Sequence, residues 1–256
     1  FIEEPRYNWC LPMHFFTNKV LSTNNTIVTM AGDIGDEIFG GYNKYLKMYH
    51  LEKKPKNWND FIKMWMVKFR APILLNMKFS FDDLHSLLIK TLPEDIWNPE
   101  DIPNSAMALD CITTVSEDFF SRNDRFGMAF SMEGRFPLSS KNFMQYCLDI
   151  NSSYKFGSKL NETKYIVKEA YKNKLPKYIL EKSKTGWSAP IMNWLDSYEP
   201  LRKKFLNDLS KDDGIKEIIS EDNYLDNLKI GKEFSGKRKI ISWMLRSWAQ
   251  EFNMFL

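Results

Sequence analysis

The hydrophobic pattern of the chain predicts one clear strand followed by a mainly helical region. Residues 26–32 begin with Thr26-Ile27-Val28-Thr29, a β-branched run typical of a buried strand. Further along, apolar residues recur at helical spacing through most of the chain. The helices predicted from this pattern cover residues 36–52, 57–69, 82–90, 105–121, 124–132, 141–150, a segment after Asn161, 191–206 and 238–253.

Capping and helix-breaking residues set the limits of several predicted helices. Pro99 and Pro103 mark a loop, and Ser105 after them is a suitable N-cap. Ser139 or Ser140 can cap the helix over 141–150, and the helix after Asn161 must stop before Pro176. The last helix shows one apolar side, formed by Ile240, Ile241, Trp243, Met244, Leu245, Trp248 and Phe252.

This order of elements predicts an α/β fold in which the remnant of a parallel sheet accompanies a mostly helical lobe. We expect one partial domain over residues 1–256, with the sheet remnant and an acidic loop in 1–52 and the helical lobe in 53–256. Hydrophobic residues make up 43% of the chain and aromatic residues 15%, which is enough to build a core and excludes a disordered chain.

Three carboxylates lie within five residues where the predicted strand meets the first helix: Asp33, Asp36 and Glu37. Open parallel sheets place their ligands at such strand ends. Carboxylates this close repel one another unless a cation or a basic partner neutralises them, and Mg²⁺ is commonly held by one or two carboxylates plus phosphates. An acidic helix N-terminus stabilised by the helix dipole is the alternative, and spacing alone favours neither.

Three sequence blocks, in the right order, resemble the asparagine synthetase family in its ATP-using synthetase domain. Residues 31–42 resemble the signature S-G-E/D-G-x-D-E-x-F-G-G-Y, and residues 124–137 resemble D-R-x-S-M-A-x-S-x-E-A-R-x-P. Residues 164–190 resemble K-x-x-L-R-x-A, then L-P, then R-x-K-x-G-F-x-x-P. With Glu3-Glu4-Pro5 and Pro12 fitting a short D-E-P…P segment, the resemblance extends from residue 3 to about 195.

The resemblance implies roles for individual residues. Asp36 stands where the family holds the Mg²⁺ that bridges the nucleotide phosphates. Asp33 stands beside the substrate and the forming adenylate, where a carboxylate can orient the amine or take its proton. Lys184 matches the lysine that stabilises the charge developing during adenylation and acyl transfer, which makes it a catalytic candidate. Glu37 is expected to cap its helix or to pair with a base.

Four further positions are candidates for the same site. Ala31 and Gly32 match positions next to the ATP and its pyrophosphate. Lys164 either contacts pyrophosphate or forms a salt bridge with one of the acids. Glu133, with Arg135 two residues on, either holds the cleft together or reaches the substrate as a catalytic residue, and the first of these roles is slightly favoured.

The implied fold is the C-terminal, mostly helical part of an adenine nucleotide alpha hydrolase-like (PP-loop) parallel-sheet domain. The implied enzyme is an asparagine synthase-like ligase of the glutamine-hydrolysing type. It uses ATP and Mg²⁺ to adenylate a carboxylate, aspartate by default, and forms an amide with ammonia or an amine while AMP and pyrophosphate leave. Departures from the family pattern, among them Ala31 for Ser, Ile34 for Gly and Lys168 for Arg, leave the acceptor open.

The family's pyrophosphate loop, S-G-G-x-D-S, and its glutamine-hydrolysing domain do not occur in these 256 residues. We therefore expect a C-terminal piece of a longer synthetase, or half of a split synthetase whose loop comes from a partner chain. The isolated chain is expected to be inactive. A catalytically inactive fragment that serves only as a helical binding or assembly lobe is the alternative.

Composition argues against several other classes of protein. A net charge of +3 is far from that of a dedicated nucleic-acid binder, and no run of 18 apolar residues predicts a membrane span. Cys10, Cys111 and Cys147 are odd in number and widely spaced, so they predict neither a zinc site nor a disulfide framework. Cysteines that form no disulfide framework are typical of a reducing compartment, and we expect a cytoplasmic location.

Overall fold

The structure is a computed structural model that describes residues 8, 10–67, 80–157, 162–182, 186, 189–210 and 232–252. These residues belong to two compact units. The first, here called the sheet unit, comprises Asn18–Phe69 and Leu88–Gly186, and the second, the C-terminal unit, comprises Phe1–Thr17, Arg70–Leu87 and Trp187–Leu256. The expected single partial domain over 1–256 stays a prediction.

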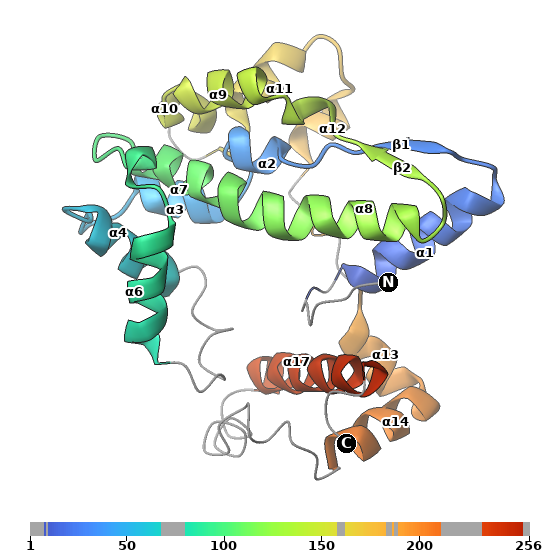
Figure 1. The fold of residues 1–256 in the computed structure, drawn as a ribbon. Helices are drawn as coiled ribbons and strands as arrows, with labels where there is room; N and C mark the ends of the chain where they lie inside the picture. Colours follow the sequence, from blue (N-terminus) through green and yellow to red (C-terminus); the bar gives the residue numbers. More distant parts are fainter. Residues whose placement is uncertain are drawn as a thin grey trace. The chain divides into compact units, whose positions relative to one another are not determined.

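The sheet unit contains a two-stranded parallel sheet (Figure 1). Strand β1 (Val28–Met30) pairs with β2 (Glu133–Arg135) in the register Val28 to Glu133 and Met30 to Arg135. Strand β1 lies within the predicted strand, but Val28 and Met30 are exposed, so the expected burial was wrong. Strand β2 was not predicted because Glu133-Gly134-Arg135 contains no β-branched or aromatic residue. The parallel pairing and the many helices confirm a mostly helical α/β structure with a small parallel sheet.

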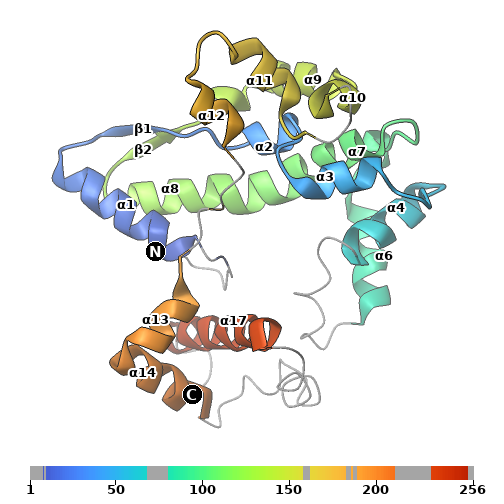
Figure 2. The ribbon, with the colours of Figure 1, turned by 180° about the vertical axis from the view of Figure 1, so that it is seen from behind.

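One long helical run leads to β2 (Figures 1 and 2). It consists of α7 (Ile102–Asp110), a π-helical stretch over Cys111–Phe120 and α8 (Ser121–Met128), which packs against β2. The predicted break between Ser121 and Asp124 is therefore wrong. No proline or glycine interrupts the run there, and an ion pair between Arg122 Nη1 and Asp118 Oδ2, 2.8 Å long, joins successive turns across the supposed break.

Helix α7 begins earlier than predicted. Asp101, not Ser105, is its N-cap, since the Asp101 carboxylate accepts a hydrogen bond of 3.2 Å from the backbone N–H of Asn104. Pro103 belongs to the first helical turn, where its missing N–H costs no hydrogen bond. The prediction was correct at α9 (Lys141–Asp149), where Ser140 accepts from the backbone N–H of Phe143 at 3.4 Å.

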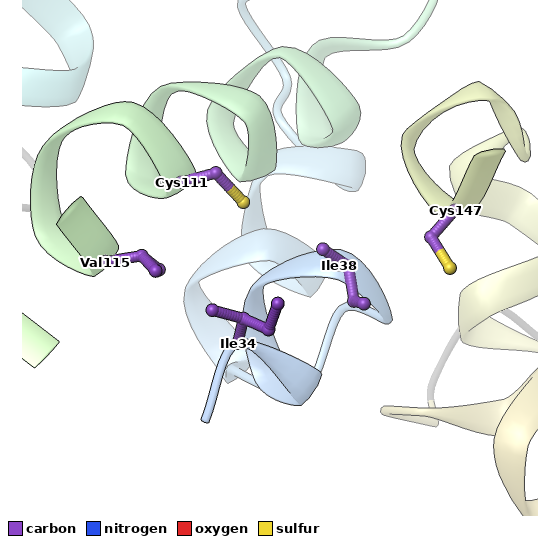
Figure 3. Packing of buried hydrophobic residues seen from close by; sticks show 5 residues of the cluster. All are labelled: Ile34, Ile38, Cys111, Val115 and Cys147. Atoms are coloured by element: carbon purple, nitrogen blue, oxygen red, sulfur yellow. The ribbon is translucent and has the colours of Figure 1, made fainter. Parts of the chain in front are cut away.

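A hydrophobic cluster fixes the short helix α2 (Gly35–Ile38) inside the sheet unit. Figure 3 shows Ile34 and Ile38 between the helix that carries Cys111 and Val115 and the helix that carries Cys147. Ile34 has a φ of 67°, in the left-handed region that β-branched residues rarely adopt. Its burial, worth about 1.5–3 kcal/mol, offsets the roughly 1–2 kcal/mol that the left-handed backbone costs.

The other helices of the sheet unit lie around this core. Helices α3 and α9 pack on α7, and α10 packs on α11. Asn57 caps α4, as its side chain accepts from Asp60 N at 2.9 Å. The helices are α3 (Asn43–Tyr49), α4 (Trp58–Trp65), α10 (Ser152–Phe156), α11 (Tyr165–Tyr171) and α12 (Lys177–Glu181), while α1 (Leu11–Thr23) and α6 (Phe81–Thr91) contain the unit boundaries.

The C-terminal unit packs α13 (Ile191–Ser197), α14 (Glu199–Ser210) and α17 (Lys232–Glu251) around Leu195, Phe205 and Ile240. The predicted helix over 191–206 is thus two helices that meet at Tyr198, and the last helix begins before residue 238. Phe252, predicted on its buried side, is 45% exposed. Within the ranges described above, no helix is both long and apolar enough to cross a membrane.

Candidate functional site

The acidic loop lies at the carboxyl end of β1. The backbone N–H of Ala31 still donates to Arg135 O of β2, at 2.9 Å, and the chain then leaves the sheet and enters α2 through Gly32, Asp33 and Ile34. Parallel sheets bind their ligands outside this end of their strands. The structure therefore places the predicted acidic loop where a small-molecule site belongs.

Asp36 and Lys164 meet across the loop. The Lys164 Nζ lies 2.9 Å from Asp36 Oδ1, and both side chains are partly exposed. Asp36 comes from the first sequence block and Lys164 from the third, so the fold joins two motifs that are far apart in the chain. The salt bridge is one of the two roles predicted for Lys164; contact with pyrophosphate stays a prediction.

A hydrogen bond from the long helical run holds the Asp33 side chain. Asn123 Nδ2 donates to Asp33 Oδ2 at 2.5 Å and also to Phe119 O at 3.0 Å, which fixes the amide against the helix. Burial raises the pKa of Asp33 above its ordinary value, and the charge of Arg122 and the hydrogen bond from Asn123 oppose this rise. A carboxylate with a raised pKa accepts a proton more readily near neutral pH.

Glu37 is buried, with 1% of its surface exposed. Its carboxylate accepts a hydrogen bond from the Tyr42 hydroxyl, and its Oε2 has no hydrogen-bond partner within the described part of the chain. Burial raises the pKa of Glu37 to about 7. Glu37 was expected to cap α2 or to pair with a base. Instead Ile34 occupies the N-cap position, and the carboxylate accepts from the Tyr42 hydroxyl and from the backbone N–H of Glu37 itself.

Replacing Glu37 with glutamine is expected to stabilise the fold above neutral pH. The folded state binds this proton more tightly than the unfolded chain, so ionisation costs stability as pH rises from about 4.5 to 7. Glu37→Gln should therefore change little at pH 4.5 and raise the free energy of unfolding by up to about 3 kcal/mol at pH 8. Urea unfolding at both pH values measures the difference.

The control for this experiment is Glu181→Gln, which removes one charge from a carboxylate whose side chain is 65% exposed. Its effect on the free energy of unfolding should stay within about 0.5 kcal/mol. An equal gain in the free energy of unfolding from Glu37→Gln at both pH values would contradict the raised pKa of Glu37. The gain would then not depend on whether the Glu37 carboxyl group is protonated.

A second buried carboxylate, Asp110, lies close enough to Glu37 for its charge to raise the pKa of Glu37. Asp110, at the end of α7, accepts a hydrogen bond of 2.5 Å from the Tyr45 hydroxyl and forms an ion pair with Lys44. Nearby, Lys155 Nζ donates to Asn104 Oδ1 at 2.7 Å, and burial lowers the pKa of Lys155 to about 8. The local sequence pattern predicts neither these contacts nor the role of Asn123, because the paired residues lie far apart in the chain.

The remaining predicted residues are placed as follows. Glu133 lies at the start of β2, opposite Val28, and its Oε1 accepts from Arg135 Nε at 3.0 Å. This position is at the other end of the strand from the acidic loop, and a catalytic role for Glu133 stays a prediction. Gly32 is exposed, with open space where a Cβ would lie, and Ala31 is partly buried. Lys184 lies outside the described residues.

The carboxylates fit a metal only in part. In the described ranges no three histidine, cysteine, aspartate or glutamate side chains gather as a metal-binding group. Asp33 and Asp36 are close enough for the charge of Asp36 to raise the pKa of Asp33. Mg²⁺ that keeps water and phosphate ligands needs only one or two such carboxylates, so the donor set suits Mg²⁺ carried by a phosphate group.

Comparisons with known proteins identify the family of this chain. The family model for asparagine synthase matches residues 1–254. "Asparagine synthetase [glutamine-hydrolyzing] 1" of Bacillus subtilis (strain 168) is 23% identical, over 72% of this chain and 34% of its own length. The chain thus spans about a third of this relative, and no solved structure gives a significant match. The chain belongs to the asparagine synthase family.

Proposed function

We propose that this chain is part of an ATP-dependent, amide-forming ligase. A substrate carboxylate oxygen attacks the α-phosphorus of ATP and pyrophosphate leaves. Ammonia or an amine then attacks the acyl carbon, loses a proton, and AMP leaves with the bonding electrons. The observation that carries this proposal is the 2.9 Å ion pair between Asp36 and Lys164 at the carboxyl end of a parallel strand.

The paired charges suit a phosphate ligand. In the proposed complex, Asp36 would be a ligand of Mg²⁺, which would neutralise phosphate charge, and Lys164 would leave Asp36 and contact the pyrophosphate. Asp33, whose pKa is raised by burial, takes the proton from the attacking amine. Lys184 stabilises the negative charge of the transition state, and the backbone at Ala31 and Gly32 lies along the nucleotide.

The proposed ligase is larger than this chain. We infer that β1 and β2 belong to a nucleotide-binding parallel sheet of the pyrophosphate-loop type, and that a further segment or a partner chain brings the S-G-G-x-D-S loop. The name of the Bacillus relative gives glutamine hydrolysis and asparagine synthesis. A reaction with glutamine as the nitrogen donor and aspartate as the acceptor goes beyond those printed words. Both are proposals for this chain.

Mg-ATP calorimetry on residues 1–256 tests the proposal. We expect weak binding, with a dissociation constant of about 1 mM, because part of the nucleotide site is supplied elsewhere. Asp36→Asn and Lys164→Ala should each weaken it at least about tenfold, since the first removes the proposed Mg²⁺ ligand and the second the proposed pyrophosphate contact. Lys172→Ala, which removes a lysine whose side chain is 57% exposed, is the control and should leave binding unchanged.

Two results would contradict the proposal. One is the absence of any Mg-ATP binding at concentrations well above 1 mM, which would mean that the acidic loop does not receive the nucleotide. The other is binding that survives both Asp36→Asn and Lys164→Ala, which would place the nucleotide elsewhere on the chain.

A further inference from the structure

A pocket of about 570 Å³ opens beside the acidic loop within the sheet unit. Gly32 and Gly35 of the loop line it, together with residues of α9, among them Cys147, and of α11, among them Val167. This volume lies within the roughly 300–1,000 Å³ of small-molecule sites. The pocket is therefore large enough for a substrate and adjoins the residues proposed to activate one.

The walls of the pocket are mostly apolar. Phe39, Leu138, Ile150 and Val167 are among the lining side chains, and Lys164, paired with Asp36, is the charged one among the lining residues described. Two tyrosines of the lining, Tyr146 and Tyr171, are 67% and 47% exposed, so they reach the solvent at its edge. The charged part of the lining is thus confined to the side of the acidic loop.

We propose that this pocket holds the apolar body of the carboxylate substrate, with the carboxylate group directed to the loop and Lys164. This inference rests on the proposed adenylation of a carboxylate. It replaces aspartate with an acid that carries an aliphatic or aromatic body, which Phe39, Leu138 and Val167 can cover. Burying such a body removes apolar surface from water at about 25 cal/mol per Å².

Aspartate fits the same walls poorly. Besides the carboxylate to be activated, it carries a second carboxylate and an ammonium group. Each of these needs hydrogen bonds or an opposite charge when it leaves water. The lining residues offer one cation, Lys164, and the carboxylate to be activated is the group proposed to contact it. Aspartate in this pocket would leave charged groups without partners, whereas an apolar acid would not.

Binding of phenylpropanoate and of aspartate to residues 1–256, measured by calorimetry without nucleotide, tests the inference. Phenylpropanoate should bind at least about tenfold more tightly than aspartate. Val167→Trp and Ala170→Trp, two substitutions that fill the pocket from α11, should each weaken phenylpropanoate binding at least about tenfold. The matched control is Tyr154→Trp, at a residue of α10 that is 66% exposed and outside the lining, and it should bind phenylpropanoate like the unsubstituted chain.

Three results would overturn the inference: aspartate binding as tightly as phenylpropanoate, phenylpropanoate binding unaffected by both tryptophans of α11, or competition between AMP and phenylpropanoate. The last would mean that the pocket receives the base of the nucleotide. Because the assay contains no ATP, its outcome is separate from that of the proposed function. Phenylpropanoate binding without any Mg-ATP binding would support the pocket and contradict the adenylation.

Discussion

Gly41→Ala is expected to abolish most Mg-ATP binding while leaving the fold nearly intact. A Cβ at residue 41 would lie 2.5 Å from Lys164 Cε and 2.7 Å from Asp36 Cγ, closer than atoms can approach. Both are near the ends of flexible side chains, so the chain can relieve the overlap by moving them. The movement takes the Asp36 carboxylate and the Lys164 ammonium away from the positions proposed for Mg²⁺ and pyrophosphate, so binding should fall at least about tenfold.

Calorimetry with Mg-ATP and urea unfolding, performed on the same preparation, distinguish loss of the site from loss of the fold. The free energy of unfolding of Gly41→Ala should fall by less than about 1 kcal/mol, the size of a surface ion-pair effect. Gly134→Ala on β2 is the matched control, because its Cβ would lie 3.6 Å from Phe136 Cζ, an ordinary contact. Unchanged Mg-ATP binding by Gly41→Ala would refute the proposed roles of Asp36 and Lys164 in nucleotide binding.

Gly40→Ala, one residue earlier, is expected to destabilise the fold instead. Gly40 has a φ of 67°, where an alanine costs about 1–2 kcal/mol. Its Cβ would lie 2.8 Å from Phe156 Cε1 and 3.0 Å from Met107 Cε, two side chains that are fully buried. Overpacking adds about 1–3 kcal/mol, so the free energy of unfolding should fall by about 2–5 kcal/mol.

Urea unfolding of Gly40→Ala and Gly41→Ala side by side checks this contrast between neighbours. Gly40→Ala should lower the midpoint far more than Gly41→Ala. A loss below about 1 kcal/mol for Gly40→Ala would mean that the backbone at residue 40 relaxes out of its left-handed conformation, and that Phe156 and Met107 do not confine it.

The sequence predicted the local part of this structure and missed the part that depends on distant pairing. β-branched residues predicted β1, and the serine before Lys141 predicted the start of α9. Strand β2 was missed because Glu133-Gly134-Arg135 becomes a strand only through pairing with β1. The predicted helical break near Ser121 was wrong, since the chain runs continuously from α7 through Cys111–Phe120 to α8.

The candidate site shows the same division. Motif resemblance located Asp33, Asp36 and Lys164, and the fold brings the last two within 2.9 Å. It gave no sign of Asn123 on Asp33, or of the Tyr45 hydroxyl on Asp110, because these contacts join residues without a shared motif. The burial of Glu37 is likewise a product of packing, and a charged residue in an acidic segment reads as exposed.

The left-handed conformation of Ile34 makes the conformation of the acidic loop depend on packing in the hydrophobic core. A glycine at this position could adopt the same backbone in the unfolded chain and in many alternative loops, whereas isoleucine is held there by its buried side chain. The buried side chain of Ile34 therefore fixes the backbone between Asp33 and Asp36. The positions of both carboxylates therefore depend on the packing of Val115 and Ile38, so a substitution in this hydrophobic cluster would also shift the acidic loop.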